Sequence, residues 1–249
     1  MTGADAPTDD AFLGGRLRLL QPARGYRAGV DAVLLAASAP VAAGDDVIDA
    51  GSGVGTVGLC VAWRCPGVSV TLIERESVLA GLARQNVARN DLAGRVRVVA
   101  ADLGDPSVLA ADGCDHLLAN PPYQIVGRGR RPPDAIKAAA HEMPAEALET
   151  WARFFARVVR PGGTVTIIHR ADALSDLFAV LDGRFGAVLV KPVHPRPEQP
   201  AIRVLVRAIK GSRAPLTIAP PLALHAADGS FTPQLDAVLR DGVAVDLGA

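Results

Sequence analysis

Short apolar runs that end in turn residues alternate with helical patterns over most of the chain, from about residue 30 to residue 185. Such alternation is typical of βαβ units, in which parallel strands are joined by crossover helices. The expected strands are 46–49, 68–74, 96–101, 115–119, 163–169, 187–191 and 202–208. The expected helices are 31–39, 57–64, 77–91, 144–160 and 172–183. The sequence therefore predicts an α/β fold with a doubly wound, mostly parallel seven-stranded sheet.

The connection between the last two expected strands, residues 192–200, is too short for a crossover helix. It predicts a C-terminal antiparallel hairpin in the otherwise parallel sheet. We expect a single domain. Its parts would be a strand and helix extension over residues 1–45, the main core over 46–210, and a tail over 211–249. A short helix near 233–240 belongs to that tail, which is expected to fold over the sheet edge.

The formal net charge is zero, so any attraction to polyanions has to come from local patches. No apolar segment reaches the roughly 18 to 20 residues of a membrane span, and the acidic start lacks the pattern of a signal peptide. We therefore expect a cytoplasmic protein without a membrane partner. Cys60, Cys65 and Cys114 have no metal-ligand spacing, which favours inert thiols and no metal.

A glycine-rich turn follows the first strand of the expected core. Asp49 ends that strand, and Gly51, Gly53 and Gly55 follow before a helix begins. Glycines at such a turn let a ligand approach the backbone N–H groups closely. NAD is one candidate ligand. Asp49 favours S-adenosylmethionine instead, because a carboxylate repels a pyrophosphate and attracts an α-amino group.

Three further polar residues end successive strands at the same expected edge of the sheet. Glu74 is placed to accept both ribose hydroxyls, and Asp102 to accept from an adenine amino group. Asn120 ends the fourth strand, so all of these side chains would line one crevice. Local roles are the alternative: Asp102 would cap the following turn, and Glu74 the following helix.

The motif Asn120-Pro121-Pro122-Tyr123 indicates methyl transfer to a planar nitrogen. The lone pair of a conjugated amino group is delocalised, so such a group is a poor nucleophile. Two oxygens that accept both of its N–H bonds favour the tetrahedral form and direct the lone pair at an electrophile. Asn120 supplies one acceptor and the Pro121 carbonyl the other. The prolines stiffen the turn, and Tyr123 offers a flat face on which a base stacks.

These motifs resemble those of class I S-adenosylmethionine-dependent methyltransferases. The closer resemblance is to bacterial enzymes that methylate adenine N6 beside the anticodon of a valine tRNA. It extends to residues 29–35, which are similar to an element that this family carries before its glycine turn. There the acidic residue lies close to the cofactor, which makes Asp31 a candidate second carboxylate beneath the methionine end. Val30 departs from the usual threonine.

The resemblance implies S-adenosylmethionine as cofactor and tRNA as partner. Alignment and desolvation would supply the rate, without a strong general base, so no histidine receives a catalytic role. Arg128, Arg130 and Arg131 follow the motif in a segment without periodicity, which we interpret as a loop that closes over a flipped nucleotide. An ordinary solvated loop is the alternative.

Two other basic clusters are candidate phosphate-binding surfaces. One spans residues 191–213 and includes Arg203 and Arg207, which would share a face of the last strand. Solvated charges at a sheet edge explain this cluster equally well. The second cluster lies near the N-terminus and contains Arg16, Arg18, Arg24 and Arg27.

Other acceptors and classes stay open. A glutamine side-chain amide is also a planar nitrogen, and release-factor glutamine-N5 methyltransferases share the motif. Those enzymes carry a helical domain before the sheet, whereas about 45 residues precede the first core strand here. Guanine-N2 methylation of ribosomal RNA is a further alternative. A small-molecule O-methyltransferase would need a base or metal that the motif does not supply. The intact polar strand ends count against a binding module without activity, and binding of S-adenosylmethionine without turnover would favour it. The sequence leaves both a monomer and a homodimer open.

Overall fold

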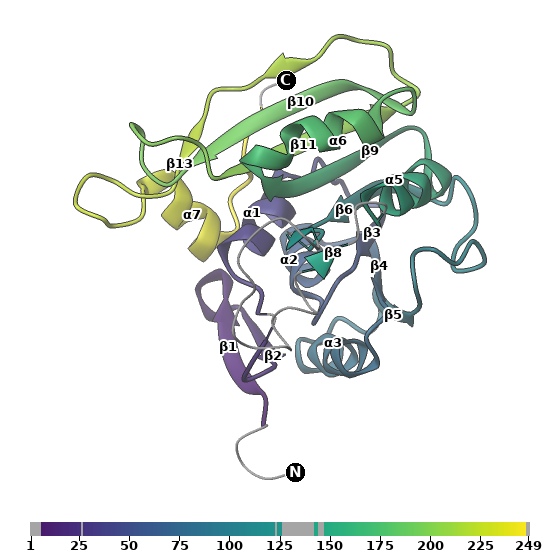
Figure 1. Cartoon of the computed structure of the whole chain (residues 1–249). Coiled ribbons are helices and arrows are strands. Elements are labelled where there is room, and N and C mark those ends of the chain that lie inside the picture. Colours follow the sequence, from purple (N-terminus) through teal and green to yellow (C-terminus); the bar gives the residue numbers. More distant parts are fainter. Residues whose placement is uncertain (1–5, 26, 123, 126–141, 144–146, 248–249) are drawn as a thin grey trace.

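The computed structural model describes residues 6–25, 27–122, 124–125, 142–143 and 147–247. Its centre is a nine-stranded sheet in the order β12-β10-β11-β9-β6-β3-β4-β5, with β13 also paired to β10 (Figure 1). The main strands are β3 (Asp46–Ala50), β4 (Ser69–Glu74), β5 (Val96–Ala100), β6 (Cys114–Ala119), β9 (Val159–Arg170), β10 (Phe185–His194) and β11 (Arg203–Lys210). Neighbours are parallel from β5 to β9, and β11 is antiparallel to both β9 and β10. The predicted mostly parallel sheet with its C-terminal antiparallel hairpin is confirmed.

Helices cover both faces of the sheet, as a doubly wound fold requires. The described helices are α1 (Val30–Ser38), α2 (Thr56–Arg64), α3 (Ser77–Arg89), α5 (Ala147–Val158), α6 (Leu174–Leu181) and α7 (Pro233–Asp241). One apolar cluster joins α1, α2, α3 and α7 to the first face, and a second joins α5 and α6 to the other. Two short 3-10 helices, η1 (Leu13–Gly15) and η2 (Ala171–Ala173), complete the helical segments that the structure describes.

Strand β9 begins earlier than the sequence predicts. The expected helix reaches residue 160 and the expected strand begins at residue 163, but Val159 already pairs with Cys114 at the start of β6. The register then shifts between Cys114 and His116, so that His116 pairs with Thr164. The chain therefore passes from α5 into β9 without a loop, and the glycines of this segment are accommodated by the irregular start of the strand.

An N-terminal hairpin packs beside α3 (Figure 1). It pairs β1 (Thr8–Phe12) with β2 (Leu17–Gln21) in antiparallel register. The alternation of basic and apolar residues over 16–19 predicts the strand of the N-terminal extension, close to β2, but not its partner. Residues of β1 alternate between half-buried and exposed, and only two of the five are apolar, so β1 carries a weak strand pattern.

The C-terminal tail runs along β10, the outermost long strand (Figure 1). Its short strands β12 (Thr217–Ile218) and β13 (Leu222–Ala223) both pair with β10 in parallel. These pairs protect the edge of the sheet and explain why the sheet has two strands more than the predicted seven. Helix α7 begins after Thr232, whose Oγ1 accepts a hydrogen bond from the Leu235 N–H at 3.3 Å.

Two further short strands, β7 (Gln124–Ile125) and β8 (Glu142–Met143), pair with each other in parallel. They flank part of the chain outside the described residues. Among the helices that the structure describes, none combines the length and the apolar character needed to cross a lipid bilayer.

Candidate active site

The glycine turn lies between β3 and α2, as expected from the sequence. Gly51, Gly53 and Gly55 have φ values of 66°, 57° and 90°, in the region that side chains strongly disfavour. The turn is tied to the neighbouring strand because the Ser52 N–H donates to the Ile73 carbonyl at 2.9 Å. Its backbone is thus held at the carboxyl end of β3, where ligands bind in sheets of this type.

Asp49 lies beneath this turn with only 1% of its surface exposed. Its Oδ2 accepts a hydrogen bond from the Gly58 N–H, in the first turn of α2, at 2.9 Å. Burial raises the pKa of Asp49 to about 7, and the nearby Glu74 charge adds to the rise, whereas the Gly58 N–H acts in the opposite direction. A cationic ligand group beside Asp49 would therefore stabilise its ionised form.

Glu74 at the end of β4 links the turn to the next helix. Its Oε2 accepts from the Gly53 N–H and its Oε1 from the Glu76 N–H, both at 2.8 Å. Glu76 is the N-cap residue of α3, so the local capping role considered for Glu74 is present. Each carboxylate oxygen has a second lone-pair direction, which leaves acceptor capacity for ligand hydroxyls.

Two buried hydroxyls at the turn indicate that a polar ligand fits there. Ser52 Oγ and Thr56 Oγ1 have no hydrogen-bond partner among the described residues, although these residues are only 5% and 2% exposed. A buried polar atom without a partner costs free energy, so such atoms point to a missing ligand or water. Ser52 and Thr56, together with Asp49 before the turn and Glu74 bonded to it, are called the polar cradle below.

Asn120 follows the last residue of β6 and lies next to this cradle. Ala119 pairs with Ala50, the residue that precedes Gly51, so the two loops leave the sheet side by side. Pro121 is buried and Pro122 is half-buried. Tyr123, Arg128, Arg130 and Arg131 lie outside the described residues, and their proposed roles stay predictions.

Asp102 and Asp31 have local partners in the structure. The Gly104 N–H donates to Asp102 Oδ1 at 2.7 Å, which is the turn-capping role considered above. The Asp102 side chain is 60% exposed and stands 3.9 Å from Arg75 in an ion pair. Asp31, in the first turn of α1, pairs with Arg203 at the start of β11.

The basic clusters are largely paired with acids or buried. Burial lowers the pKa of both Lys191 and Arg207, and Asp246 acts against that shift in each case. Lys210 donates to Asp112 Oδ1 at 2.6 Å. In the N-terminal cluster, Arg16, Arg18 and Arg27 pair with Asp241, Asp9 and Asp10, respectively. These contacts give much of both clusters a structural role.

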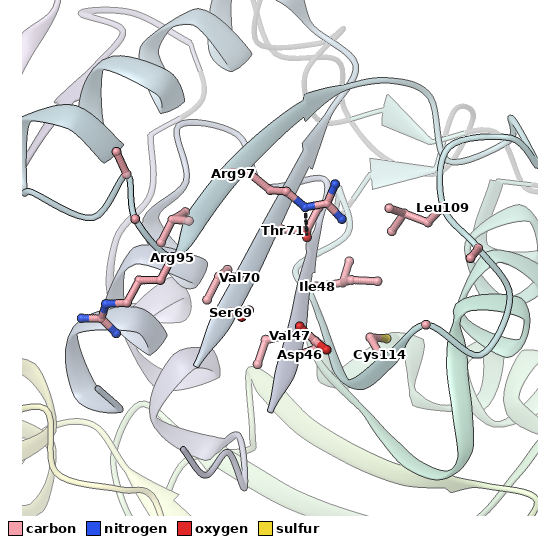
Figure 2. A pocket seen from close by; sticks show the side chains of 15 residues that line it. Asp46, Val47, Ile48, Ser69, Val70, Thr71, Arg95, Arg97, Leu109 and Cys114 are labelled. Carbon is pink, nitrogen blue, oxygen red and sulfur yellow. Dashed lines mark hydrogen bonds between the residues drawn. The ribbon is translucent and has the colours of Figure 1, made fainter. Parts of the chain in front are cut away.

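Figure 2 shows a pocket of about 480 Å³. It lies at the opposite ends of the strands from the cradle. Its lining includes the first residues of four strands, Asp46, Ser69, Val96 and Cys114. The segment between β5 and β6 forms turns instead of a crossover helix, so this part of the sheet face is less covered. Arg97 crosses the face and donates from Nε to Thr71 Oγ1 at 3.0 Å (Figure 2).

The described residues contain no group of three or more His, Cys, Asp or Glu side chains arranged to hold a metal ion. Burial raises the pKa of the Cys60 and Cys114 thiols to about 12, which keeps them protonated. Burial lowers the pKa of His169 to about 4. His169 is therefore neutral near pH 7.

Sequence reasoning missed three residues of the site. Ser52 and Thr56 belong to the glycine-turn segment, so their position could have marked them as ligand candidates. Trp151 on α5 gave no such signal, because its contact with the turn depends on how α5 packs over the sheet. An ideal Cβ on Gly51 would lie only 2.5 Å from Trp151 Cη2.

The chain is similar in sequence and fold to known proteins. The family model described as methyltransferase small domain matches residues 28–190. A tRNA1(Val) (adenine(37)-N6)-methyltransferase from Aeromonas hydrophila is 29% identical over 208 residues, which cover 83% of this chain and 85% of that protein. The solved structure of a predicted O-methyltransferase from Agrobacterium tumefaciens is 31% identical, with a TM-score of 0.73, and the match covers 86% of this chain and 98% of that one.

TrmN from Thermus thermophilus shares the fold, with a TM-score of 0.52 and 24% identity over 73% of this chain and 48% of its own. The match to the family model includes the glycine turn, Glu74, Asp102 and Asn120. The chain belongs to the methyltransferase small domain family, and its cofactor is S-adenosylmethionine.

Proposed function

We propose that this methyltransferase acts on the N6 amino group of an adenine in tRNA, beside the anticodon. The observation that carries the proposal is the pairing of Ala119 with Ala50, which brings Asn120 next to the glycine turn. The nitrogen-directing motif thus begins where the methyl donor would lie. Relatives that carry the name tRNA1(Val) (adenine(37)-N6)-methyltransferase support tRNA as the substrate.

Four carboxylates would lie around the cofactor. Asp49 attracts the α-amino group, because burial makes its lone negative charge costly without a cation. Glu74 accepts from the ribose hydroxyls through its remaining lone pairs, and Asp102 accepts from the adenine amino group. Asp31 would lie beneath the methionine end. When bound, S-adenosylmethionine supplies an electrophilic methyl group on a sulfonium.

Asn120 and Pro121 would orient the acceptor nitrogen. The Asn120 side-chain oxygen and the Pro121 carbonyl each accept one N–H of the adenine amino group, which directs its lone pair at the methyl carbon. The proton lost from nitrogen passes to one of these oxygens or to water. Tyr123 would stack on the base, and Arg128, Arg130 and Arg131 would hold flanking phosphates.

The direct test is incubation with S-adenosylmethionine and, separately, unmodified total tRNA, unmodified ribosomal RNA and a release factor. Mass spectrometry of the digested products then identifies the methylated group. N6-methyladenosine in the tRNA and no methylglutamine in the release factor is the expected result. Methylglutamine would instead favour the protein acceptor. N2-methylguanosine in the ribosomal RNA would favour guanine-N2 methylation.

Asn120→Ala tests the role of the motif. We expect it to abolish methyl transfer while cofactor affinity, measured by calorimetry, stays close to that of the wild type. Asn90→Ala is a matched control, because Asn90 lies in the connection after α3 and bonds to Arg18 in the N-terminal hairpin. Near-normal turnover of Asn120→Ala would contradict the proposed mechanism.

A further inference from the structure

Trp151 presses the edge of its ring against the first glycine of the cofactor turn. An ideal Cβ on Gly51 would lie 2.5 Å from Trp151 Cη2 and 3.2 Å from Cζ2. Real Cβ atoms do not approach other atoms so closely, so the indole occupies the place that a side chain would need. Gly51 thus has no Cβ for two reasons: its φ is positive, and a side chain there would overlap Trp151 on α5.

The side of the indole away from Gly51 packs against the core. Trp151 and Phe155, one turn later on α5, are in edge-to-face contact, with ring centroids 6.1 Å apart and planes at 90°. Phe155 is 1% exposed, and Trp151 is partly buried against the same apolar cluster. Edge-to-face aromatic pairs have a preferred geometry, so the ring of Trp151 is held in one orientation.

The residue before Trp151 approaches a second loop of the site. An ideal Cβ on Gly104 would lie 3.8 Å from Thr150 Cγ2, and the Gly104 N–H holds Asp102. The N-terminal part of α5 therefore lies against both the glycine turn and the turn after β5. These are the loops that carry the proposed contacts to the two ends of the cofactor.

We propose that Trp151 is a positioning residue that holds the glycine turn in its ligand-binding conformation and couples α5 to cofactor binding. Three glycines give this turn high conformational freedom, which binding would otherwise have to remove. The bonds from Ser52 to Ile73 and from Gly53 to Glu74 fix the turn on the side of β4. Trp151 fixes its other side. This inference rests on the assignment of the turn to the cofactor under the proposed function.

The fluorescence of Trp151 can be used to test this contact. The chain has two tryptophans. Trp63 lies on α2, where the Arg16 guanidinium stacks over its ring at 5.4 Å, and it belongs to the opposite apolar cluster. Trp63→Phe leaves Trp151 as the single tryptophan. Titration of this variant with S-adenosylhomocysteine, the demethylated cofactor, is expected to change its emission with the same dissociation constant that calorimetry gives.

Two substitutions separate positioning from simple folding. Trp151→Ala is expected to raise the dissociation constant of S-adenosylhomocysteine by about tenfold, because the freed turn has to be ordered on binding. Trp151→Phe should recover most of that loss. The KM for S-adenosylmethionine should rise more than kcat falls, and thermal unfolding confirms that each variant is folded. Trp63→Ala is the matched control and should bind as the wild type does.

The outcomes distinguish this inference from the proposed function. Emission that stays constant at saturating ligand, or wild-type affinity in Trp151→Ala, would overturn the role of Trp151 alone. If the wild type bound no S-adenosylhomocysteine, both the cofactor assignment of the turn and this inference would fall. A clear Trp151 response without any methylation of tRNA would support this inference and overturn only the proposed acceptor.

Discussion

Arg203 donates from Nε to Asp31 Oδ2 at 2.9 Å, and this ion pair joins the start of β11 to the first turn of α1. The two residues are 172 positions apart, and both side chains are 26% exposed. Asp31 was expected beside the cofactor and Arg203 on a phosphate-binding surface. The pair gives each residue a structural role in addition, because it fixes α1 on the sheet near the glycine turn.

Arg203→Gln is therefore expected to lower the free energy of unfolding by about 1 kcal/mol, as for a partly exposed ion pair that anchors two elements. Urea unfolding measures the change, and the loss should shrink at high salt because screening weakens the wild-type pair. Arg153→Gln is the control, since its pair with Glu149 is within one helix and its side chain is 73% exposed. Equal effects of the two substitutions would contradict an anchoring role for Arg203.

Asp49 should make the ligand-free protein less stable as the pH rises from about 4 to 7. Its folded-state pKa of about 7 lies above the ordinary value of 3.8. In this window the folded state keeps a proton that the unfolded state has released, so raising the pH favours unfolding. The total effect is a few kcal/mol, since one pKa unit corresponds to about 1.4 kcal/mol. The free energy of unfolding in urea should be measured against pH for the wild type and for Asp49→Asn. The difference between the two curves gives the contribution of Asp49, because the other groups titrate in both proteins.

The same carboxyl should control cofactor affinity. Only ionised Asp49 attracts the cationic α-amino group, so affinity for S-adenosylhomocysteine should rise between pH 6 and pH 7.5 in the wild type. Asp49→Asn should bind more weakly and without this rise. A parallel rise in both proteins, measured by calorimetry, would assign the pH dependence to another group.

The strand ends of the candidate site were predictable because they follow from local patterns. Asp49, Glu74, Asp102 and Asn120 each close an apolar run, and the parallel order of the strands brings them to one edge. The positive φ values at Gly51, Gly53 and Gly55 also fit the residue type, since few other residues adopt them.

The contacts that the sequence did not predict join distant segments. Strand β1 has too few apolar residues to stand out, and β12 and β13 are only two residues long each. The Arg203 to Asp31 pair and the contact of Trp151 with Gly51 both arise from packing between elements, which leaves no periodic signal along the chain.

Asn86 and Asn90 provide a matched pair for the N-terminal hairpin. Asn86 is fully buried; its Oδ1 accepts from the Leu20 N–H at 2.7 Å, and its Nδ2 donates to the carbonyls of Leu20 and Val54. Asn90 makes the equivalent two bonds to Arg18 in a more exposed position. Asn86→Ala should cost about 2 to 4 kcal/mol, because buried backbone groups lose their partners, and Asn90→Ala about 1 kcal/mol.

Asn86 also bonds to Val54 inside the glycine turn, so its loss should weaken cofactor binding, whereas Asn90→Ala should not. Chemical denaturation and calorimetry measure the two effects separately. If both variants lost the same stability and kept full cofactor affinity, the hairpin would not be coupled to the site through Asn86.

Gly58 and Gly81 should respond in opposite directions to the same change, although both lie inside helices. Alanine is favoured over glycine in a helix by about 1 kcal/mol. An ideal Cβ on Gly81 in α3 meets no atom within 4 Å, so Gly81→Ala should stabilise the protein by about 0.5 to 1 kcal/mol. A Cβ on Gly58 in α2 would overlap Leu72 Cδ2 and lie 2.9 Å from Val70 Cγ1. Gly58→Ala should therefore destabilise by about 1 to 3 kcal/mol despite the helical preference.

Gly58→Ala should also weaken cofactor binding. The Gly58 N–H is the hydrogen-bond donor that lowers the pKa of Asp49, and a Cβ would push α2 away from β4 and strain that bond. Cofactor affinity at pH 7 should then fall in Gly58→Ala, because a weaker bond from Gly58 raises the pKa of Asp49 further and leaves less of it ionised. Raising the pH to 8 should restore part of the affinity. A loss of affinity that is independent of pH would place the defect in the turn rather than in the Asp49 carboxyl.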